Sequence, residues 1–412
     1  MSTADSTASD AVVAGQVVTH DEIFTREPRP PGSFFALMDR WRENGPVHRG
    51  EAAGQSFYLV TRMADIRATY QQPGVFSNTA IQIDNPNPEY QLIPEMLDPP
   101  EHGKWRKLLG PLFSPGAIDA MESNVRARFA EILDDVAPRG HCDYVADVAL
   151  RFPNTIFLEL MGMPIELADQ FQQWETAMVH APDTTAPSFM AAVNEVTQYF
   201  AGLVAERFRD PGDDLVSRAT KWTIDGAPIT EHDLLSFCLL MFQAGLDTVT
   251  AQLTYAMYHL ATHPADQARI VADPSLIRSA NEEFLRFYSI VAPSRKALQD
   301  TEIAGCPVKK GEMVLLPLSA ANRDPEEFER ADQVLIDRQA NRHLAFGAGP
   351  HRCLGSHLAR LELEVAMQLW HERIPLYRID PNVTIDEHAG GLVGLNNLPL
   401  RWQAERAAER GG

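Results

Sequence analysis

The stretch FGAGPHRCLG, residues 346–355, places one cysteine in a glycine-rich loop directly before the helical pattern SHLARLELEVAMQL. A thiolate at a helix start faces free backbone amides and the positive end of the helix dipole, and both lower a thiol pKa. Cys353 is therefore a candidate metal ligand. Glycine lets the backbone approach a flat ligand closely and adopt positive φ, so Gly347, Gly349 and Gly355 suit a cysteine docked beneath a planar macrocycle. The alternative is a glycine-rich turn around an inert cysteine, because cysteine is usually a small buried hydrophobe.

The charge and the amino terminus of the chain restrict its partners and its location. A formal net charge of −20 argues against a nucleic-acid partner, which needs a basic patch, and it disfavours an anionic membrane surface. The first residues, MSTADSTASDAVVAGQ, contain neither a positive region nor a sustained apolar stretch. We therefore expect no signal peptide, no membrane anchor and a cytoplasmic protein.

The four cysteines show no CxxC pairing, which argues against a zinc ribbon, a thioredoxin-like couple and covalently attached haem. We expect the three cysteines outside the loop, Cys142, Cys238 and Cys306, to be reduced thiols in the core.

Helical patterns dominate residues 100–290, whereas EIAGCPVKKGEMVLLPLSA at 302–320 has the punctuation of hairpin strands. The sequence thus predicts a mainly α fold with small β-sheets. Its most apolar segment begins after Thr230, an N-cap with Asp233 at the third helical position, and ends at His263 and Pro264. One helix of this length would span roughly 48 Å, and an almost uniformly apolar surface predicts that it is buried.

A polar step interrupts the middle of this predicted helix at Ala244, Gly245, Asp247 and Thr248. A threonine hydroxyl can donate to the carbonyl four residues earlier, here that of Ala244, which bends the helix and opens a notch. With room from Gly245, the notch could admit dioxygen or water beside a metal. The alternative is that Thr248 packs in the core and Asp247 is a solvated or ion-paired charge.

The pattern FGxGxHxCxG in residues 346–355 resembles the haem-binding signature of the cytochrome P450 family, the haem-thiolate monooxygenases. The resemblance extends to DPPEHGKWR at 98–106, AGLDTV at 244–249, EEFLR at 282–286 and LNNLPL at 395–400. One departure is Pro350, where the family often has an aromatic or aliphatic residue. The resemblance implies a cytochrome P450-like fold with a long central helix crossing over haem b.

The resemblance also implies roles for single residues. Cys353 would be the axial ligand, and Asp247 and Thr248 would be the acid and alcohol that relay protons to dioxygen. The implied haem contacts are His102, Arg106, Ala244, Gly245, Arg295, Phe346, Gly347, His351 and Gly355. Four of them, the two histidines and the two arginines, would bind the propionates, because buried carboxylates need charge-assisted hydrogen bonds. Taken singly, each of these four would be an ordinary surface side chain.

Glu283 and Arg286 lie three residues apart, and spacing alone predicts a surface ion pair of little energetic value. The resemblance instead implies a buried network in which a later arginine supports the cysteine loop. We assign that arginine to Arg338, with Arg342 as the competitor. These residues would be structural and not catalytic.

If these distant residues meet one cofactor, no linker can separate independent domains, although the length alone would suggest two or three. We expect one domain at 21–404 around one large core, with a disordered tail at 1–20 and a flexible tail at 405–412. The chain has no GxGxxG fingerprint and no ferredoxin-type cysteine cluster, so a separate ferredoxin and ferredoxin reductase would supply electrons. Basic residues near the cysteine could steer them: Lys104, Lys107, Arg352 and Arg360.

No lysine or arginine occurs between Arg67 and Lys104 or between Arg151 and Arg207, where the resemblance places lids over the substrate pocket. Their apolar residues indicate a neutral hydrophobic substrate of terpenoid, steroid or aromatic type, although plain core is the alternative. The candidate pocket residues are Ile81, Ile83, Met178, Gln243, Val291 and Val393. Rival functions are a peroxide-using haem enzyme and a non-catalytic haem or ligand carrier, and the retained acid and alcohol pair argues against both.

Overall fold

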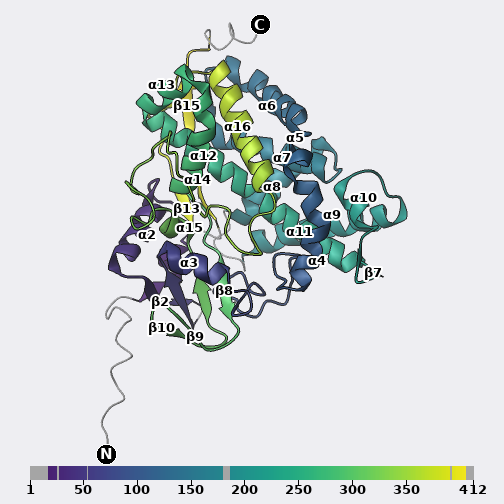
Figure 1. The fold of residues 1–412 in the computed structure, drawn as a ribbon. Coiled ribbons are helices and arrows are strands. Elements are labelled where there is room, and N and C mark those ends of the chain that lie inside the picture. The colour runs from purple at the N-terminus through teal and green to yellow at the C-terminus, as the bar shows by residue number, and fades with distance from the viewer. Residues whose placement is uncertain (1–16, 26, 53, 180–185, 390–391, 405–412) are drawn as a thin grey trace, which may run out of the picture.

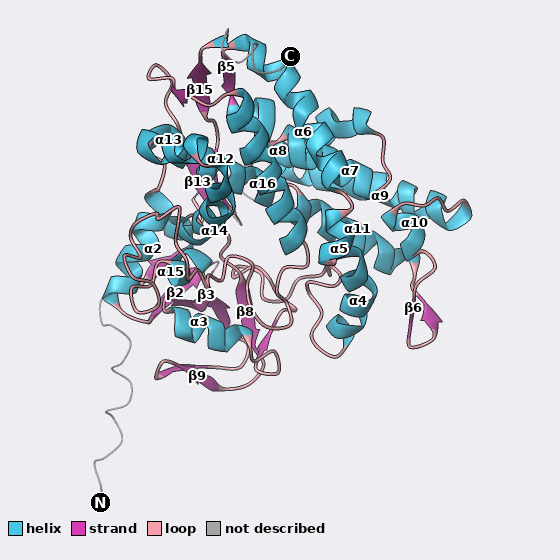
Figure 2. Cartoon of the chain, turned by 45° about the horizontal axis from the view of Figure 1, so that its top comes forward, coloured by secondary structure: helices cyan, strands magenta, loops and turns pink. Residues whose placement is uncertain are grey.

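The computed structural model describes residues 17–25, 27–52, 54–179, 186–389 and 392–404, and it combines long helices with short strands (Figures 1 and 2). The helices are α1 (His20–Ile23), α2 (Ser33–Asn44), α3 (Met63–Tyr70), α4 (Glu101–Leu109), α5 (Pro115–Asp119), α6 (Glu122–Val136), α7 (Arg151–Leu160), α8 (Ala168–Val179), α9 (Pro187–Arg209), α10 (Leu215–Ala219), α11 (Glu231–Gly245), α12 (Asp247–Thr262), α13 (Pro264–Ala272), α14 (Ile277–Phe287), α15 (Leu318–Asn322) and α16 (Ser356–Arg373). The mainly α fold with small sheets is thus confirmed.

The strands form one larger sheet and several small ones. They are β1 (Val18–Thr19), β2 (Val47–Ala52), β3 (Gln55–Val60), β4 (Phe76–Ser77), β5 (His141–Asp143), β6 (Thr223–Ile224), β7 (Ala227–Pro228), β8 (Ser294–Ala297), β9 (Thr301–Ile303), β10 (Cys306–Val308), β11 (Met313–Leu315), β12 (Tyr377–Ile379), β13 (Glu387–Ala389), β14 (Val393–Leu395) and β15 (Pro399–Trp402). Six strands pair in the order β1-β2-β3-β11-β8-β4, with β11 parallel to β3 and antiparallel to β8. The predicted hairpin is β9 and β10. In Figure 1 the strand-rich part lies at the lower left, and α16 crosses in front of the helical part.

The predicted long central helix is present as the stretch Glu231–Thr262, and an interruption at Leu246 divides it into α11 and α12. Thr230 and Asp233 form the predicted capping box at the start of α11, and α12 ends before His263. At the interruption Leu246 has a distorted right-handed helical conformation, with φ −101° and ψ −70°. The stretch Glu231–Thr262 is long and apolar enough to cross a membrane, yet half of its most apolar window is buried inside the protein. A core helix of this length has the same composition, and the expected burial holds mainly for α12.

The buried core is divided into three clusters, whereas we expected one. The first surrounds α12, α16 and the last strands, the second lies among α7 to α11, and the third lies between the six-stranded sheet and α3. Partly buried side chains such as Met121, Leu358 and Leu361 pack against both the first and the second cluster. The core is divided because the helices pack mainly against one another, whereas the six-stranded sheet buries a separate face against α3.

The boundary predicted at residue 20 also needs correction. Val18 is fully buried and pairs with Gly50, so β1 already belongs to the larger sheet. Residues 1–16 and 405–412 lie outside the described residues. Cys142, Cys238 and Cys306 are free and buried, as predicted.

A carboxyl group is buried in α16 without a compensating partner. Glu362 is 3% exposed, and its Oε2 has no hydrogen-bond partner. Desolvation raises the pKa of Glu362 to about 8. The folded protein therefore holds this side chain protonated at neutral pH, whereas the unfolded chain would ionise it.

Replacing Glu362 by glutamine should stabilise the protein at neutral pH. Because the folded pKa is raised, the wild-type protein loses stability as the pH rises from the ordinary carboxyl pKa toward 8, and glutamine removes this loss. We expect Glu362→Gln to gain on the order of 2 kcal/mol at pH 7.5 and little at pH 5. Urea unfolding at the two pH values measures it, with the exposed Glu372→Gln on the same helix as control. Equal gains at both pH values would contradict the prediction.

Candidate functional site

The cysteine loop is folded by two glycines and rests on the end of α3. Gly347 and Gly349 both have φ +68°, the conformation that glycine adopts without strain. A Cβ at position 349 would lie 2.4 Å from the carbonyl oxygen of Tyr70, so the backbones touch there. The amide of Cys353 donates to the carbonyl of Phe346 at 2.8 Å and closes the loop. Gly355 has φ −76° and serves as the N-cap of α16.

The environment of Cys353 differs from the prediction in its electrostatics. Cys353 is solvent-exposed, yet many protein atoms surround its thiol. Their desolvating effect raises the thiol pKa. A hydrogen bond from the amide of Gly355 and the charges of Arg106 and Arg352 act in the opposite direction without prevailing. We had expected a lowered thiol pKa from the helix start alone. A bound metal cation would reverse the balance, because a coordinating thiol loses its proton.

A carboxylate that sequence reasoning missed braces the loop from α14. Glu282 accepts two hydrogen bonds from Arg360, at 2.6 and 2.9 Å, and lies 3.1 Å from His343 Nε2. Burial would raise the pKa of Glu282, but the hydrogen bonds from His343 and Arg360 lower it to about 2. The guanidinium of Arg360 also lies 4.5 Å from the ring centre of Phe346. The only sign of this role in the sequence was that Glu282 directly precedes Glu283, the carboxylate of the predicted network.

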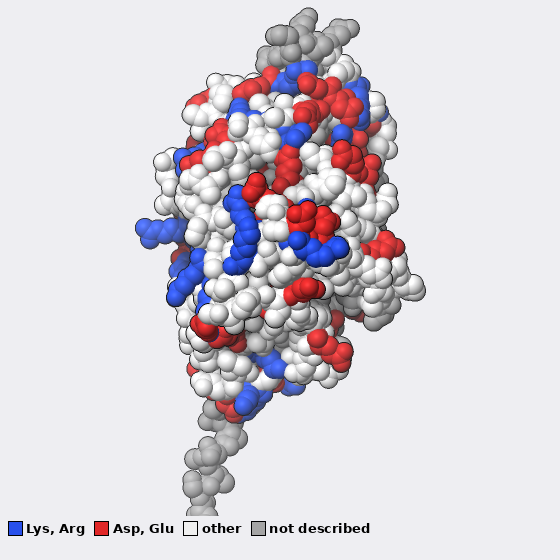
Figure 3. Space-filling model, turned by 90° about the vertical axis from the view of Figure 1, so that its right-hand side faces the viewer, with Lys and Arg blue, Asp and Glu red and all other residues white. Residues whose placement is uncertain are grey.

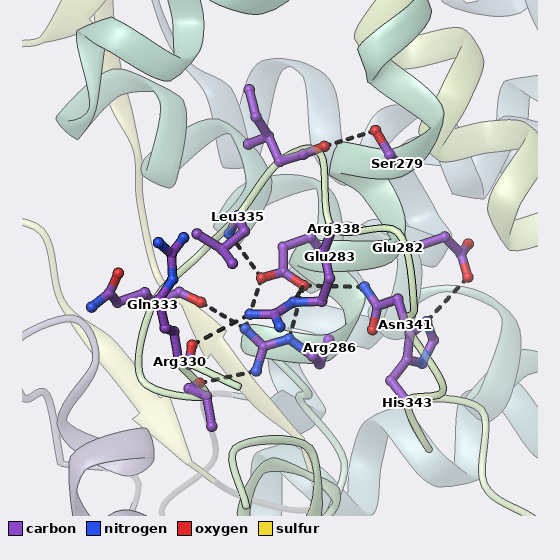
Figure 4. A network of polar contacts seen from close by, with 12 residues as sticks. Ser279, Glu282, Glu283, Arg286, Arg330, Gln333, Leu335, Arg338, Asn341 and His343 are labelled. Atoms are coloured by element: carbon purple, nitrogen blue, oxygen red, sulfur yellow. Dashed lines mark hydrogen bonds and ion pairs between the residues drawn. The ribbon is translucent and has the colours of Figure 1, made fainter. Parts of the chain in front are cut away.

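The buried network around Glu283 contains the predicted third arginine. Arg286 donates to both oxygens of Glu283, at 2.8 and 2.7 Å, and both side chains are fully buried. Arg338 donates to the same carboxylate at 2.9 Å, and Asn341 adds a bond of 3.1 Å (Figure 4). The structure therefore selects Arg338, whereas Arg342 is exposed.

The same arginines bind the chain that leads to the cysteine loop. Arg286 donates to the carbonyls of Asn322, Ala331 and Gln333 at 2.7 to 3.0 Å. Arg338 donates to the carbonyl of Glu329 at 2.8 Å. Figure 4 shows Arg286 and Arg338 side by side against Glu283, with Gln333, Leu335 and Asn341 of the segment before the loop around them. These bonds fix the path of that segment.

Four of the predicted cofactor contacts lie together. The rings of His102 and His351 are stacked with centroids 3.9 Å apart, and Arg295 lies 4.7 Å from the ring centre of Tyr70. Desolvation, with a smaller effect of Arg106, lowers the pKa of His102 to about 4. Desolvation, then His102 and Arg295, lower the pKa of His351 to about 2. The two histidines and the two arginines thus lie together, and the positive charges of the arginines disfavour protonation of the histidines.

Part of this donor cluster lacks a partner. Nε2 of His351 is buried with no hydrogen-bond partner, and Arg106 has no ion pair or hydrogen bond within the described ranges. Asn78 joins the cluster, because its amide lies 3.3 Å from His351 Nδ1 and donates to Glu95 at 2.7 Å. Arg295 donates to the carbonyl of Ser294 at 2.7 Å. The cluster has the chemistry to bind a further anionic group.

The central helix carries the predicted threonine bond at its break. Thr248 donates to the carbonyl of Ala244 at 3.1 Å. Sequence reasoning missed a second threonine, Thr250. Its hydroxyl lies 3.2 Å from the carbonyl of Leu246 and 2.9 Å from that of Ala149, to both of which it can donate. The second contact joins the break to the segment just before α7. Ala244 is exposed although it lies in the middle of the fold.

The helix break and the cysteine loop border the same part of the core. Leu246 is buried in the second cluster, and Leu354, the residue after Cys353, packs against that cluster. The predicted pocket residues lie in different parts of the structure. Ile83 and Val393 are buried in the first cluster, Ile81 and Val291 are partly buried, Met178 packs against the second cluster, and Gln243 is exposed on α11.

The predicted basic patch is weaker than its composition suggested. Lys104 binds Glu101 and Asp225, and Arg360 binds Glu282 as described, so neither is a free cation. Lys107 and Arg352 remain exposed. Figure 3 shows basic and acidic side chains interspersed on the face that it draws, as expected for an acidic chain.

Comparison with known proteins identifies close structural and sequence relatives. The family profile described as Cytochrome P450 matches residues 32–370. A probable cytochrome P450 127A1 of Sinorhizobium fredii is 33% identical over 94% of this chain and 95% of its own. The vitamin D3 dihydroxylase of Streptomyces griseolus is 32% identical over 90% and 94%. The crystal structure of cytochrome P450 CYP101C1 has a TM-score of 0.84 at 31% identity, covering 96% of this chain and 99% of that one.

Removing Arg338 should destabilise the protein, because the negative charge of Glu283 would then be buried with one partner fewer. We expect Arg338→Ala to lower the free energy of unfolding by about 3 kcal/mol. Arg342→Ala removes an exposed arginine from the same segment and should have little effect. Denaturant unfolding compares the two variants, and equal losses would refute the assignment of Arg338.

Proposed function

The chain belongs to the cytochrome P450 family, and we propose that this monooxygenase hydroxylates a neutral hydrophobic small molecule with electrons from a separate ferredoxin and ferredoxin reductase. The family membership makes haem its cofactor, and haem b is the form that we propose. The observation that carries the proposal is Cys353, an accessible thiol in a loop braced by two carboxylate networks.

The residues present fit a haem. Cys353 would bind the iron, and the cluster of His102, Arg106, Arg295 and His351 would bind the propionates. The fit rests on the unpartnered nitrogen of His351 and on the crowding of donors without enough acceptors. When bound, haem supplies a thiolate-coordinated iron that activates dioxygen for insertion of one oxygen atom into a C–H bond.

The protein contributes a proton path at the helix break. The hydroxyl of Thr248 donates its proton to the carbonyl of Ala244. The lone pairs of Thr248 Oγ1 can therefore accept a hydrogen bond from another donor. Asp247 stands beside it as the first residue of α12. We assign Thr248 as the alcohol that holds a proton at Oγ1 and Asp247 as the acid that supplies it.

The proposed substrate class rests on the two segments without lysine or arginine. Within the first, Ile83, Leu92 and Ile93 are at most 8% exposed, and Tyr90 donates to Gln82 at 3.2 Å. One cation does contact this segment. The ammonium of Lys296, in β8, donates to the carbonyl of Pro86 at 2.9 Å and to the side-chain oxygen of Asn87 at 2.7 Å. These bonds occupy the ammonium, which supports a neutral terpenoid, steroid or aromatic substrate over an acid.

The proposed electron donors are proteins, and the exposed Lys107 and Arg352 would contact an acidic ferredoxin. Reductase and ferredoxin would pass electrons singly to the cysteine side. Relatives named as mycinamicin IV hydroxylase/epoxidase and vitamin D3 dihydroxylase support hydroxylation as the reaction.

Coordination by Cys353 can be tested by spectroscopy. The reduced protein with carbon monoxide should absorb at about 450 nm, the band of a thiolate-coordinated haem. Cys353→Ser should lose this band, whereas Cys306→Ser, at a buried cysteine outside the loop, should keep it. A wild-type preparation that is folded and loaded with haem but lacks the band would overturn the assignment.

Thr248 should control the coupling of electrons to product. Because Thr248→Ala removes the hydroxyl but no proposed haem ligand, we expect haem binding to persist while product per NADH falls at least about tenfold and peroxide rises. The substrate would be a compound selected by its high-spin shift of the absorption spectrum.

Thr248→Ser retains the hydroxyl and serves as the control, with coupling near that of the wild type. Full product yield from Thr248→Ala would exclude the relay. Equal turnover with peroxide alone would favour the rival peroxide-using enzyme.

A further inference from the structure

The side chain of Asn78 lies inside the donor cluster, directly after β4. Asn78 is 1% exposed. Its Nδ2 lies 2.6 Å from the backbone carbonyl oxygen of Glu95, 2.7 Å from Oε1 of the same residue and 3.3 Å from Nδ1 of His351. Its Oδ1 is buried and has no hydrogen-bond partner among the described residues. The amide is therefore held through its nitrogen alone.

The backbone carbonyl of Glu95 determines which way this amide faces. A carbonyl oxygen can only accept a hydrogen bond, so the atom of Asn78 that lies 2.6 Å from it has to be the NH2 group. A flipped amide would instead place Oδ1 against this carbonyl oxygen and against the carboxyl group of Glu95. Because a backbone carbonyl does not titrate, the orientation holds whether Glu95 is ionised or not.

The same contact determines which nitrogen of His351 carries the proton. An amide NH2 only donates, so Nδ1 of His351 has to accept and cannot carry a hydrogen itself. A neutral imidazole has one accepting and one donating nitrogen, and the proton therefore lies on Nε2. Nε2 is the ring nitrogen that is buried without a partner. The cluster thus contains a buried N–H group that lacks an acceptor.

The start of α4 holds both side chains in place. The backbone amide of Asn78 donates to the carboxylate of Asp98 at 2.9 Å, and the backbone carbonyl of Asp98 accepts from the amide of His102 at 3.0 Å. The ring of His102 in turn stacks on the ring of His351, with centroids 3.9 Å apart. The position of the amide and the plane of the His351 ring are therefore fixed by the same short segment.

We propose that Asn78 is a positioning residue for His351, whose amide donates to Nδ1 and so keeps Nε2 as a hydrogen-bond donor for a carboxylate of the cofactor. The inference rests on the propionate contact proposed for His351. The NH2 group has two hydrogens for three acceptors, so the two oxygens of Glu95 share one and His351 receives the other. In the other tautomer, Nε2 would present a lone pair to a carboxylate, and the contact would be repulsive.

Nuclear magnetic resonance of protein labelled with 15N-histidine tests the tautomer without turnover. The reduced, haem-loaded protein with carbon monoxide is diamagnetic, and His351→Gln identifies the His351 signals by their absence. The protein contains a reference for each tautomer. Nε2 of His48 faces two backbone carbonyls at 2.7 and 3.0 Å, whereas Nδ1 of His371 faces one at 2.7 Å. His351 should resemble His48, and a His351 signal of the His371 type would overturn the proposal.

Variants of Asn78 test whether this side chain sets the tautomer. Asn78→Asp replaces the donor by an acceptor and should place a proton on Nδ1 of His351. Asn78→Ala removes the donor without adding a charge, so the ring should populate both tautomers. Glu95→Gln is the control, because the backbone carbonyl of residue 95 still orients the amide, and it should keep the wild-type tautomer. Wild-type signals in both Asn78 variants would overturn the positioning role.

Retention of haem separates this inference from the role of His351 itself. Transfer of haem to excess apomyoglobin should become about tenfold faster in Asn78→Asp and in His351→Gln, because each loses one hydrogen bond to a charged group. Asn78→Ala should also accelerate it, which excludes the new charge as the cause, and Glu95→Gln should not.

The two measurements fail in different ways. Wild-type transfer rates in His351→Gln and in both Asn78 variants, with the tautomers as predicted, would overturn the propionate contact of His351. Faster transfer in His351→Gln alone, with unchanged tautomers in the Asn78 variants, would overturn only the role of Asn78.

Discussion

The path of the chain around the cysteine depends on the charge of one buried carboxylate, that of Glu283. A buried charge is tolerated only when it is paired and hydrogen-bonded. Glu283 meets this condition with donors from Arg286, Arg338, Asn341 and the amide of Leu335. All but the first come from the segment that precedes the cysteine loop. The carboxylate therefore specifies a route for a stretch of chain that has little regular structure of its own.

The neighbouring carboxylate extends this support to the other side of the loop. Successive residues of a helix point about 100° apart, so Glu282 and Glu283 enter different networks. Glu283 fixes the chain that enters the loop, and Glu282 binds Arg360 of the helix that leaves it. Two adjacent residues of α14 thus hold both ends of the segment that presents Cys353, and the loop needs little hydrophobic core of its own.

Features that depend on local sequence could be predicted, and those that depend on distant partners could not. The capping box of α11, the bond from Thr248 to Ala244 and the glycine conformations at 347 and 349 follow from neighbouring residues. The ion pair of Arg360 with Glu282 and the raised thiol pKa of Cys353 depend on segments far away in the sequence. The helix break at Leu246 lies between these cases, because the local bond indicated a bend while the fastening through Thr250 to Ala149 was not visible.

The contact between Gly349 and the carbonyl of Tyr70 has a consequence for the order of assembly. The cysteine loop contacts the end of α3, which packs against the sheet that joins β1, β2 and β3 to β8 and β11. Because β8 and β11 end at Ala297 and Leu315, this support is complete only shortly before Cys353 leaves the ribosome during synthesis. Haem capture should accordingly be a late step of maturation, which follows the pairing of early with late strands.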